Sequence, residues 1–531
     1  MQMTLKRFGI PLSTLFFLLT TFVFSFSLQA QQNKRVEIET QGNADEMIVV
    51  PIGDEGLILF SQVAPGKFTF AKYSTDLQQD WTVDCIVNTT LDLSKYVYNG
   101  KSLYLLFSRF KSPTYQVVKL NVKAGFAEKF EMRSVNKLEI TDFEAIGTSV
   151  FIAGKTRSEP ILLHLNLQNK QTQVLPTAVK GKAEIQSLEL DTVNQQLNVA
   201  FATWRGRENK LIIKSFSPDG HQINSVALDS EPEKNLLTGR VSTPQPGQEL
   251  VIGTYGTRGS SYTNYSRGYY TRSVYTGTAD YTQGLYISKL NDGQSQFIKY
   301  YSFTDFKNFF KFMNGRQQER MEKRIKKRKQ QGKDLKLQYR LLVHDIIQRN
   351  GQYIMVAEAY YPEYRNNNYY APGMFGYGYG YYGYGYGGYN GYGRNTPVFD
   401  GWVYTHAVIA GFDMQGNLLW DNSFEINDVK TYSLREKVKV SFSQENIVLA
   451  YSHKGMLKSK IIRGNDIVEG KEDLPLRAEY EGDVVRKSSV DNVDYWYQNN
   501  FLAWGYQKIR NQKDEQVKGR RNVFYFSKVG F

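Results

Sequence analysis

The sequence predicts an all-β fold: a β-propeller of seven or eight four-stranded blades with one inserted basic helix. Two observations lead to this prediction. Short runs of apolar and β-branched residues recur between turn signals, which is the pattern of many short strands. A strand–turn–strand unit also repeats at an interval close to the length of one propeller blade. Because 41% of the 531 residues are hydrophobic, the chain can bury a large core, and wholesale disorder is excluded.

The repeated unit has two clear copies. Residues 407–420 read AVIAGFDMQGNLLW, and residues 70–81 read FAKYSTDLQQDW. In each copy a strand leads into a polar turn, and a Trp beyond the turn is expected to pack on the next layer. Equivalent strand residues of the first four units, at intervals of 47, 45 and 51 residues, are Tyr73, Leu120, Leu165 and Phe216. These intervals match four-stranded blades of about 40–50 residues.

The spacing predicts eight blades, with seven as the alternative. The expected starts lie near Met47, Leu93, Leu138, Ile185, Leu236, Leu337, Tyr432 and Val484. The last blade ends at residues 522–531 with only three strands. Residues 34–39 alternate between polar and apolar side chains and are expected to supply its fourth strand. Such a closure would remove the exposed edge of the sheet.

The turn-plus-Trp unit resembles the blades of bacterial secreted propellers of the quinoprotein-like and related repeat families. This resemblance implies a fold and no particular activity. The rival architecture is two or three β-sandwich domains. Even spacing of the units, and the lack of Pro/Gly linkers between them, favour one propeller domain over residues 31–531.

The first thirty residues are predicted to be a secretory signal peptide. Lys6 and Arg7 precede an apolar stretch over residues 12–26, and the small Ala30 stands at the expected cleavage site. The alternative is a membrane anchor, but the apolar stretch is short for a span of about 20 residues. No later segment is apolar enough to cross a membrane. We therefore expect an exported protein, periplasmic or associated with the outer membrane rather than released.

Composition and motifs also exclude several kinds of functional site. The single cysteine, Cys85, excludes an intramolecular disulfide and cysteine-based zinc sites. Five histidines leave little material for a His-rich metal centre. The chain has no Gly-x-Ser-x-Gly elbow, no His-Glu-x-x-His and no phosphate-binding glycine loop. We therefore predict no metal, no cofactor and no assigned catalytic residue.

Three insertions interrupt the repeat. Residues 255–283 are rich in Tyr, Ser and Gly and lie between the second and third strands of the fifth blade. Residues 304–336 contain the one strong helix and join the fifth blade to the sixth. Residues 360–402 form a Tyr/Gly-rich segment of low complexity between the second and third strands of the sixth blade. Such loops and connections emerge on one face of a propeller, so all three are expected over blades five and six.

The basic helix is a candidate for contact with an anionic partner. Residues 316–331 hold eight Lys or Arg and two acids. The residues proposed for this contact are Arg320, Arg324, Lys327 and Arg328. The alternative is a solvated charged helix that packs only its Phe-rich start on the propeller. Because the protein is expected to be exported, we predict no nucleic-acid partner.

The Tyr-rich insertions are candidates for stacking against a protein or a glycan. The residues proposed for these contacts are Tyr269, Tyr270, Tyr381, Tyr382 and Tyr386. The alternative for residues 376–393 is a disordered insertion, because nine of the eighteen residues are Gly and so much Gly disfavours a compact core.

The function predicted first is a non-catalytic scaffold or binding module of the cell envelope, whose partner is an envelope protein or a glycan. The alternative is an enzyme that cleaves a glycan or a peptide in the central channel, and inward-facing Asp, Glu, His and Arg would favour it. His344, Asp345 and His406 are expected on inner strands there. The acidic pairs Asp142/Glu144 and Glu189/Asp191 are too common a pattern to assign. A quinoprotein-like dehydrogenase is a third interpretation, but the chain lacks its cofactor signature.

Overall fold

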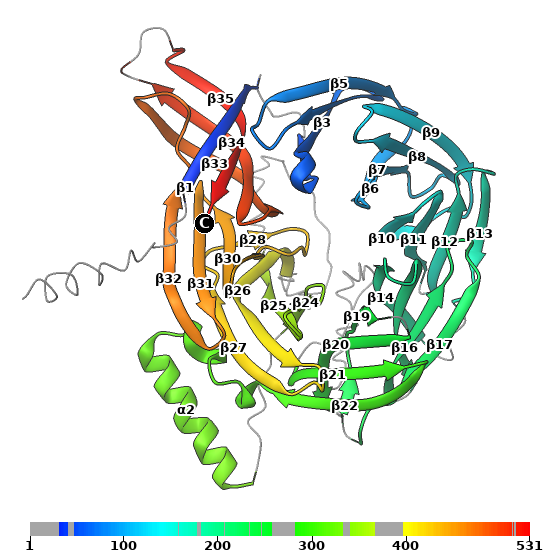
Figure 1. Ribbon diagram of the computed structural model, residues 1–531, viewed down its shortest axis with the longest axis vertical. Coiled ribbons are helices and arrows are strands. Elements are labelled where there is room, and N and C mark those ends of the chain that lie inside the picture. The colour runs from blue at the N-terminus through cyan, green and yellow to red at the C-terminus, as the bar shows by residue number, and fades with distance from the viewer. Residues whose placement is uncertain are drawn as a thin grey trace, which may run out of the picture.

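The computed structural model is an eight-bladed β-propeller. It describes residues 31–40, 47–157, 159–177, 182–205, 208–232, 234–245, 247–257, 282–332, 340–366, 397–511, 513 and 517–531. Eight antiparallel sheets follow one another around a ring, which Figure 1 shows from above. The predicted all-β propeller, with the larger of the two blade numbers, is thereby confirmed.

The first four blades each contain four strands, which follow chain order from the innermost strand outward. Blade I contains β2 (Ile48–Pro51), β3 (Leu57–Ala64), β4 (Lys67–Tyr73) and β5 (Gln79–Ile86), with the short helix η1 (Gly53–Glu55) after β2. Blade II contains β6 (Asp92–Tyr98), β7 (Ser102–Ser108), β8 (Thr114–Asn121) and β9 (Phe126–Arg133). Blade III contains β10 (Glu139–Ile146), β11 (Ser149–Thr156), β12 (Glu159–Asn166) and β13 (Gln171–Leu175). Blade IV contains β14 (Lys182–Asp191), β15 (Gln196–Arg205), β16 (Glu208–Phe216) and β17 (Gln222–Leu228).

Blades V and VI have divided inner strands. Blade V contains β18 (Lys234–Leu236) with β19 (Arg240–Gln245), then β20 (Gln248–Thr257), β21 (Gly284–Asn291) and β22 (Gln294–Ser302). Blade VI contains β23 (Arg340–Val343) with β24 (Ile347–Arg349), then β25 (Gln352–Asn366), β26 (Pro397–Asp413) and β27 (Leu418–Glu425), and β28 (Lys430–Thr431) pairs with β26. Blade VII contains β29 (Lys439–Ser443), β30 (Asn446–His453), β31 (Met456–Arg463) and β32 (Asp466–Pro475). Blade VIII contains β33 (Asp483–Tyr497), β34 (Asn500–Asn511), β35 (Arg520–Gly530) and β1 (Gln31–Glu39).

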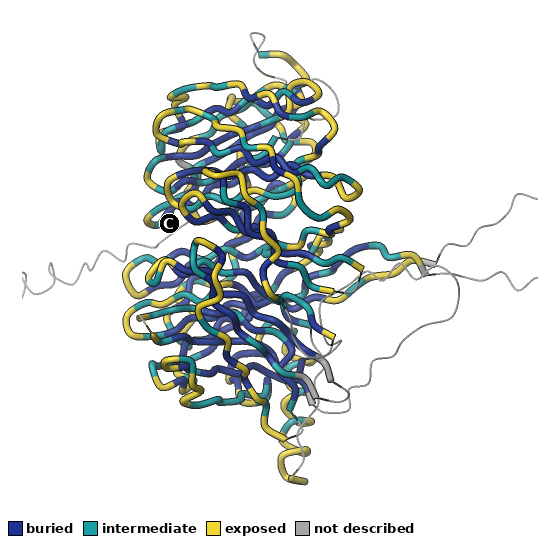
Figure 2. The backbone as a smooth tube through the Cα atoms, turned by 90° about the vertical axis from the view of Figure 1, so that its right-hand side faces the viewer, coloured by how far each residue is buried: buried dark blue, intermediate teal, exposed yellow. Residues whose placement is uncertain are grey.

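The core consists of apolar layers between neighbouring blades. All seven residues of β7 are buried, because both faces of this central strand are covered by adjacent sheets. Between blades I and II, Phe60, Phe68 and Phe107 belong to one buried cluster, and the rings of Phe68 and Phe107 meet edge to face with centroids 5.1 Å apart. Figure 2 shows the buried backbone running through the blades, with exposed residues at the turns.

The ring is closed by the first described strand. β1 pairs antiparallel with β35, with Val36 opposite Phe526, and so becomes the outermost strand of the last blade. The predicted contribution of residues 34–39 to the last blade is confirmed. Closure covers the edge of β35 that would otherwise present unpaired N–H and C=O groups.

A buried ion network accompanies this closure. Arg521 on β35 donates to Glu37 on β1, with Nη2 3.1 Å from Oε2, and also to Asp483 on β33. Arg35 lies 2.8 Å from Glu37 and places its guanidinium 4.1 Å from the ring centre of Tyr525. The side chains of Arg521, Glu37 and Asp483 are at most 5% exposed, so each charge depends on its partners.

The structure corrects the predicted start of one blade and defines the ends of the basic helix. Blade VII begins at Lys439 rather than near Tyr432, which is 75% exposed on the connection into that blade. The basic helix α2 spans Gly315–Gln330, and the side chain of Asn314 caps it by accepting from the Gln317 N–H at 3.0 Å. Gly332 follows with φ of 65°, as expected of a glycine that ends a helix.

Arg521→Gln is predicted to lower the thermal unfolding midpoint strongly. The substitution leaves the buried carboxylate of Asp483 without its cation and leaves Glu37 with Arg35 alone. Breaking a buried pair in this way costs about 3–5 kcal/mol. Lys518→Gln is the control, because Lys518 and Glu39 form an exposed ion pair in the same blade. Differential scanning fluorimetry measures the unfolding midpoints of both variants. Equal midpoints for the two variants would contradict a stabilising role of the network.

Candidate functional site

The segment before α2 is fixed to the outer edge of the propeller. It contains the short helices η2 (Phe303–Asp305) and η3 (Phe309–Phe312). The carboxylate of Asp421, on β27, accepts from the backbone N–H groups of Lys307 and Asn308 at 2.8 and 2.6 Å. The Asn308 side chain donates to the Asp421 carbonyl at 2.6 Å. These contacts give the helix a rigid base beside blade VI.

Aromatic rings complete this base. Phe303 stacks on Phe309 with centroids 4.6 Å apart, and Phe312 stacks on His406 at 3.6 Å. His406 is fully buried, and this burial lowers its pKa to about 3, so the ring is neutral. The expectation that His406 lies on an inner strand is wrong. It belongs to β26, the third strand of blade VI, where it supports the helix base rather than the channel.

Most of the helix is exposed to solvent. No residue of α2 is fully buried, and Met321 and Ile325 are its half-buried apolar side chains. The four proposed contact residues Arg320, Arg324, Lys327 and Arg328 are all exposed. Their spacing of four, three and one places them along one side of the helix, which we call the basic stripe.

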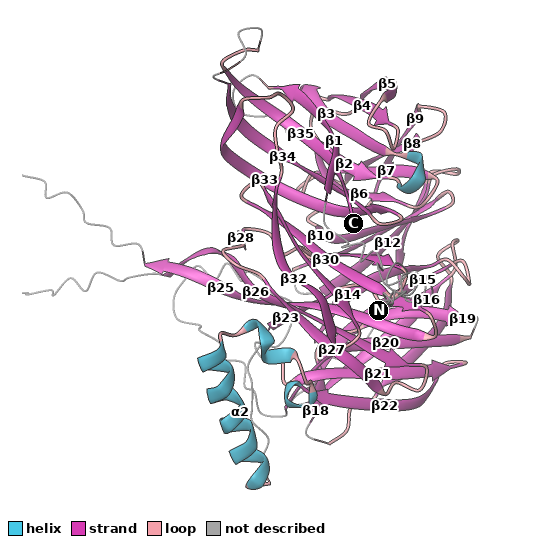
Figure 3. Cartoon of the chain, turned by 60° about the vertical axis from the view of Figure 1, so that its left-hand side comes forward, coloured by secondary structure: helices cyan, strands magenta, loops and turns pink. Residues whose placement is uncertain are grey.

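The elements that carry the three insertions meet at one face of the ring. In Figure 3, α2 and the long β25–β26 hairpin project from the same side of the propeller. In the sequence, residues 258–281 separate β20 from β21, and residues 367–396 separate β25 from β26. Tyr269, Tyr270, Tyr381, Tyr382 and Tyr386 lie outside the described residues.

The central channel contains a group of acidic side chains around one arginine. Arg240, on the inner strand of blade V, lies 3.5 Å from Glu189 of blade IV and 3.3 Å from Asp345 of blade VI. Its Nε donates to the Val343 carbonyl at 3.1 Å. The carboxyl of Glu144 on blade III interacts electrostatically with Asp345 and Glu189. The inner edges of four blades therefore contribute to one cluster.

This environment alters the acidity of the cluster. Burial raises the pKa of Glu144 to about 8, with a further contribution from the carboxylates of Asp142 and Asp345. Burial also raises the pKa of Glu189 to about 8 in spite of Arg240. Burial opposes the charge of Arg240, but Glu189 and Asp345 hold its pKa above the ordinary value. Two carboxyl groups that keep their protons near neutrality can donate them, as general acids do.

A second chain of charges continues around the channel. His344 Nε2 lies 2.8 Å from Glu358 Oε1, which also accepts from the backbone N–H groups of Lys437 and Val438. Lys439 lies 3.3 Å from Glu436. Its other partner is Asp494 of blade VIII at 3.5 Å. These contacts link blades VI, VII and VIII.

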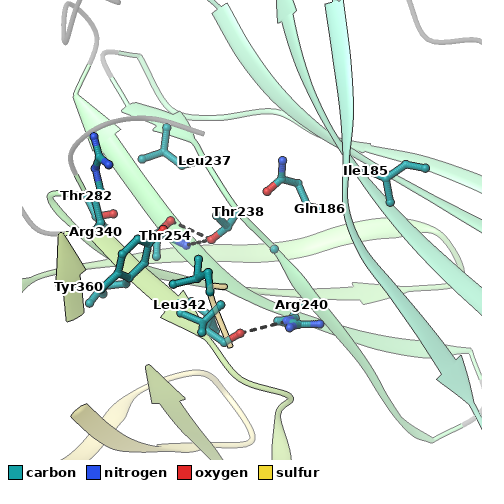
Figure 4. Close-up of a pocket in the computed structure, with 14 residues that line it drawn as sticks. Ile185, Gln186, Leu237, Thr238, Arg240, Thr254, Thr282, Arg340, Leu342 and Tyr360 are labelled. Carbon is teal, nitrogen blue, oxygen red and sulfur yellow. Dashed lines mark hydrogen bonds between the residues drawn. The ribbon is translucent and has the colours of Figure 1, made fainter. Parts of the chain in front are cut away.

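A pocket of about 210 Å³ lies beside the acidic cluster (Figure 4). Arg240 and Thr238 of blade V, with Leu342 of blade VI, form part of its wall. The residues next to the three insertions also line it: Thr254 and Thr282 for the first, Arg340 for the second and Tyr360 for the third. The pocket therefore opens at the face from which the insertions emerge. Among the described residues, no group of His, Cys, Asp and Glu has the arrangement of a metal site.

The structure unites some of the residues that sequence reasoning noticed and separates others. It brings Asp142, Glu144, Glu189 and Asp345 together in the channel, although none of them was assigned a role. Asp191 caps its own turn by accepting from the Val193 and Asn194 N–H groups at 3.0 Å. Arg240 and Glu436 were missed, because neither stands in a recognisable motif.

Comparisons with known proteins assign the chain to no family. No family model and no curated protein matches the chain. Among solved structures, the polysaccharide lyase Uly1 is similar with a TM-score of 0.36 and 6% identity, over 83% of this chain and 89% of the lyase. The propeller domain of the Trilobed protease from Pyrococcus furiosus gives a TM-score of 0.33 and 9% identity, over 82% and 95%. A prolyl endopeptidase is similar with a TM-score of 0.36 and 8% identity, over 83% of this chain and 50% of the endopeptidase. At these values the likeness carries no argument about activity.

Glu144→Gln is predicted to flatten the dependence of stability on pH. The pKa of about 8 in the folded protein exceeds the ordinary value of 4.5, so the folded state retains a proton that the unfolded chain releases. Stability contributed by this group is therefore present at low pH and is lost as pH rises from about 5 to about 8. The variant does not ionise, so its unfolding midpoint should fall less over this range.

Glu139→Gln is the matched control, because Glu139 is an exposed carboxylate on the same strand. The thermal unfolding midpoints of the wild-type protein and of both variants are measured across this pH range. A variant profile parallel to that of the wild-type protein would show that Glu144 is not protonated near neutrality.

Proposed function

We propose that the protein is an exported, non-catalytic binding module of the cell envelope, which holds a protein or glycan partner on the face that carries the three insertions. The observation that carries this proposal is the basic stripe of α2. It is exposed on a base that is fixed to blade VI by hydrogen bonds that Asn308 donates to Asp421. A rigid base presents exposed charge to a partner at little further entropic cost.

The surroundings of the stripe support a binding role. Of the eight cations in residues 316–331, Lys323 is neutralised by Glu319 at 2.6 Å, and that pair is exposed. The excess positive charge on one short helix would steer an anionic partner surface. The Tyr residues of the neighbouring insertions would add flat aromatic contacts, which suit sugar rings and protein surfaces alike.

The proposed location follows from the first thirty residues. Their basic start, apolar stretch and small residue at the cleavage position support export. The described part of the chain contains no helix long and apolar enough to cross a membrane. Association with the periplasm or the outer membrane would then depend on the partner that the insertion face holds.

Reversing the basic stripe is predicted to abolish partner capture. The variant carries Arg320→Glu, Arg324→Glu, Lys327→Glu and Arg328→Glu, and the fold should persist because all four side chains are exposed. Reversal replaces attraction by repulsion, so recovery of the partner should fall by about tenfold or more and should be sensitive to salt. Affinity purification of the tagged protein from gently solubilised envelopes, with quantitative mass spectrometry, measures the recovery.

The matched control reverses four exposed cations of blade II, on the opposite side of the ring: Lys101, Arg109, Lys111 and Arg133. Equal recovery of a stoichiometric partner by both variants would refute a role of the stripe. A protein that lacks residues 376–393 tests the Tyr/Gly tract in the same assay. If this deletion unfolds the propeller, the tract is structural and the binding proposal loses that part.

A second candidate function is an enzyme that cleaves a glycan or a peptide in the channel. The specific observation that favours it is the channel cluster, in which Glu144 and Glu189 keep pKa values of about 8 beside Arg240 and a pocket. A protonated carboxyl next to a charged group can act as a general acid in hydrolysis.

For this alternative, Glu189→Gln is predicted to lower hydrolysis by about a hundredfold, the contribution typical of a general acid. A panel of labelled polysaccharides and peptides at neutral pH provides the assay. The blade II reversal serves as the control because it leaves both the channel and the insertion face intact. Turnover that survives Glu189→Gln would exclude this residue as the acid.

A further inference from the structure

A groove of about 620 Å³ separates the helix α2 from the segment that anchors it. Phe306 and Phe310, in the anchoring segment, and Ile325, on the helix, form its apolar lining. The polar residues along the groove are Thr304, Lys307, Gln318, Glu322, Lys326, Lys329 and Gln330. Its size is that of a binding pocket, and it is separate from the channel pocket and from the basic stripe.

The two sides of α2 differ in character. Gln318, Glu322, Ile325 and Lys329 share the side that faces the groove, whereas the basic stripe lies on the other side. A helix that lies in a membrane interface turns its apolar side toward lipid. In α2 the apolar side chains face the propeller, so a bilayer would meet only charge. This arrangement favours a protein segment over lipid as the occupant of the groove.

The charged residues along the groove indicate which kind of protein segment it would bind. Three lysines and one glutamate line the groove. Lys329 is 3.7 Å from Asp305, whereas Lys326 forms no ion pair within the described residues. The amide groups of Gln318 and Gln330 can pair with the backbone of a peptide, because each offers both donors and an acceptor. The lining thus complements an acidic peptide that carries a large apolar side chain.

We propose that this groove binds a short acidic peptide segment of the partner protein. One large apolar side chain of the segment packs between Phe310 and Ile325, and its carboxylates contact Lys326 and Lys307. The peptide lies along α2 in the manner of a segment docked in an apolar groove. This inference rests on the proposed binding function and names the chemistry of the partner.

The test uses a defined probe: a fluorescein-labelled peptide of about 12 residues that contains only Leu and Glu, followed by fluorescence anisotropy with the full-length mature protein. The same peptide with Lys in place of Glu is the charge control. Vesicles of phosphatidylglycerol, in a sedimentation assay, test lipid as the occupant.

Two cations of α2 provide the matched variants. Lys326 lines the groove, whereas the exposed Arg316 belongs neither to the groove nor to the basic stripe, so Lys326→Ser should weaken peptide binding by about fivefold and Arg316→Ser by less than about twofold. Ile325→Ser should weaken it by about tenfold or more, because it removes an apolar wall. Circular dichroism checks that the helix persists in each variant.

Binding of the acidic peptide that follows this order supports the proposal. Equal losses for Lys326→Ser and Arg316→Ser, or equal affinity for the Lys-containing peptide, would overturn it. Vesicle binding that depends on Ile325 and Lys326, without peptide binding, would also overturn it in favour of lipid. If the groove variants leave partner capture intact while stripe reversal abolishes it, the binding function stands and the groove assignment alone fails.

Discussion

Closure of the ring is the constraint on which the rest of this structure depends. A propeller with an open last blade would leave the edge of β35 unpaired and blades VIII and I free to separate. Pairing of β1 with β35 and the buried Arg521 network join the two ends of the ring. Closure fixes the number of blades, and the number of blades fixes the width of the channel. Interactions across the channel, such as that between Asp142 and Arg240, exist only because the width is fixed.

The same architecture explains where additional chain is tolerated. β20 and β21 pair without interruption from Gln248 opposite Asn291 to Tyr255 opposite Gly284. β25 and β26 pair over fifteen residue positions of β25, so each hairpin is complete up to its insertion. Because the cost of closing a loop grows only slowly with its length, long insertions at these hairpins need not destabilise the blade. The connection that carries α2 differs from these hairpins. Asp421, Asn308 and a cluster of Phe rings fix the segment before α2 to the outside of blade VI.

The sequence predicted those features that depend on local patterns. Strands alternate with turns, and turns such as that at Asp413 are recognisable because the carboxylate accepts from the Gln415 and Asn417 N–H groups. The channel cluster could not be found in this way. Glu144 and Arg240 are far apart in the chain, and local irregularities decide where inner-strand side chains point: the pairing of β10 shifts between Ile140 and Asp142. His406 was misplaced for a related reason, since its position in the long β26 depends on where the insertion ends.

The two candidate functions are linked by geometry. Thr254, Thr282, Arg340 and Tyr360 border the insertions and also line the channel pocket, so the insertion face surrounds the mouth of that pocket. A partner held by the basic stripe and the Tyr-rich loops would lie beside the acidic cluster rather than remote from it. A binding face and a reactive channel are therefore compatible in one molecule: capture on the insertions would raise the local concentration of a chain end at Glu144 and Glu189. The distinction between scaffold and enzyme then depends on these two carboxyl groups. In an enzyme they would transfer protons to the bound partner, whereas in a scaffold they would only stabilise the propeller that presents the insertion face.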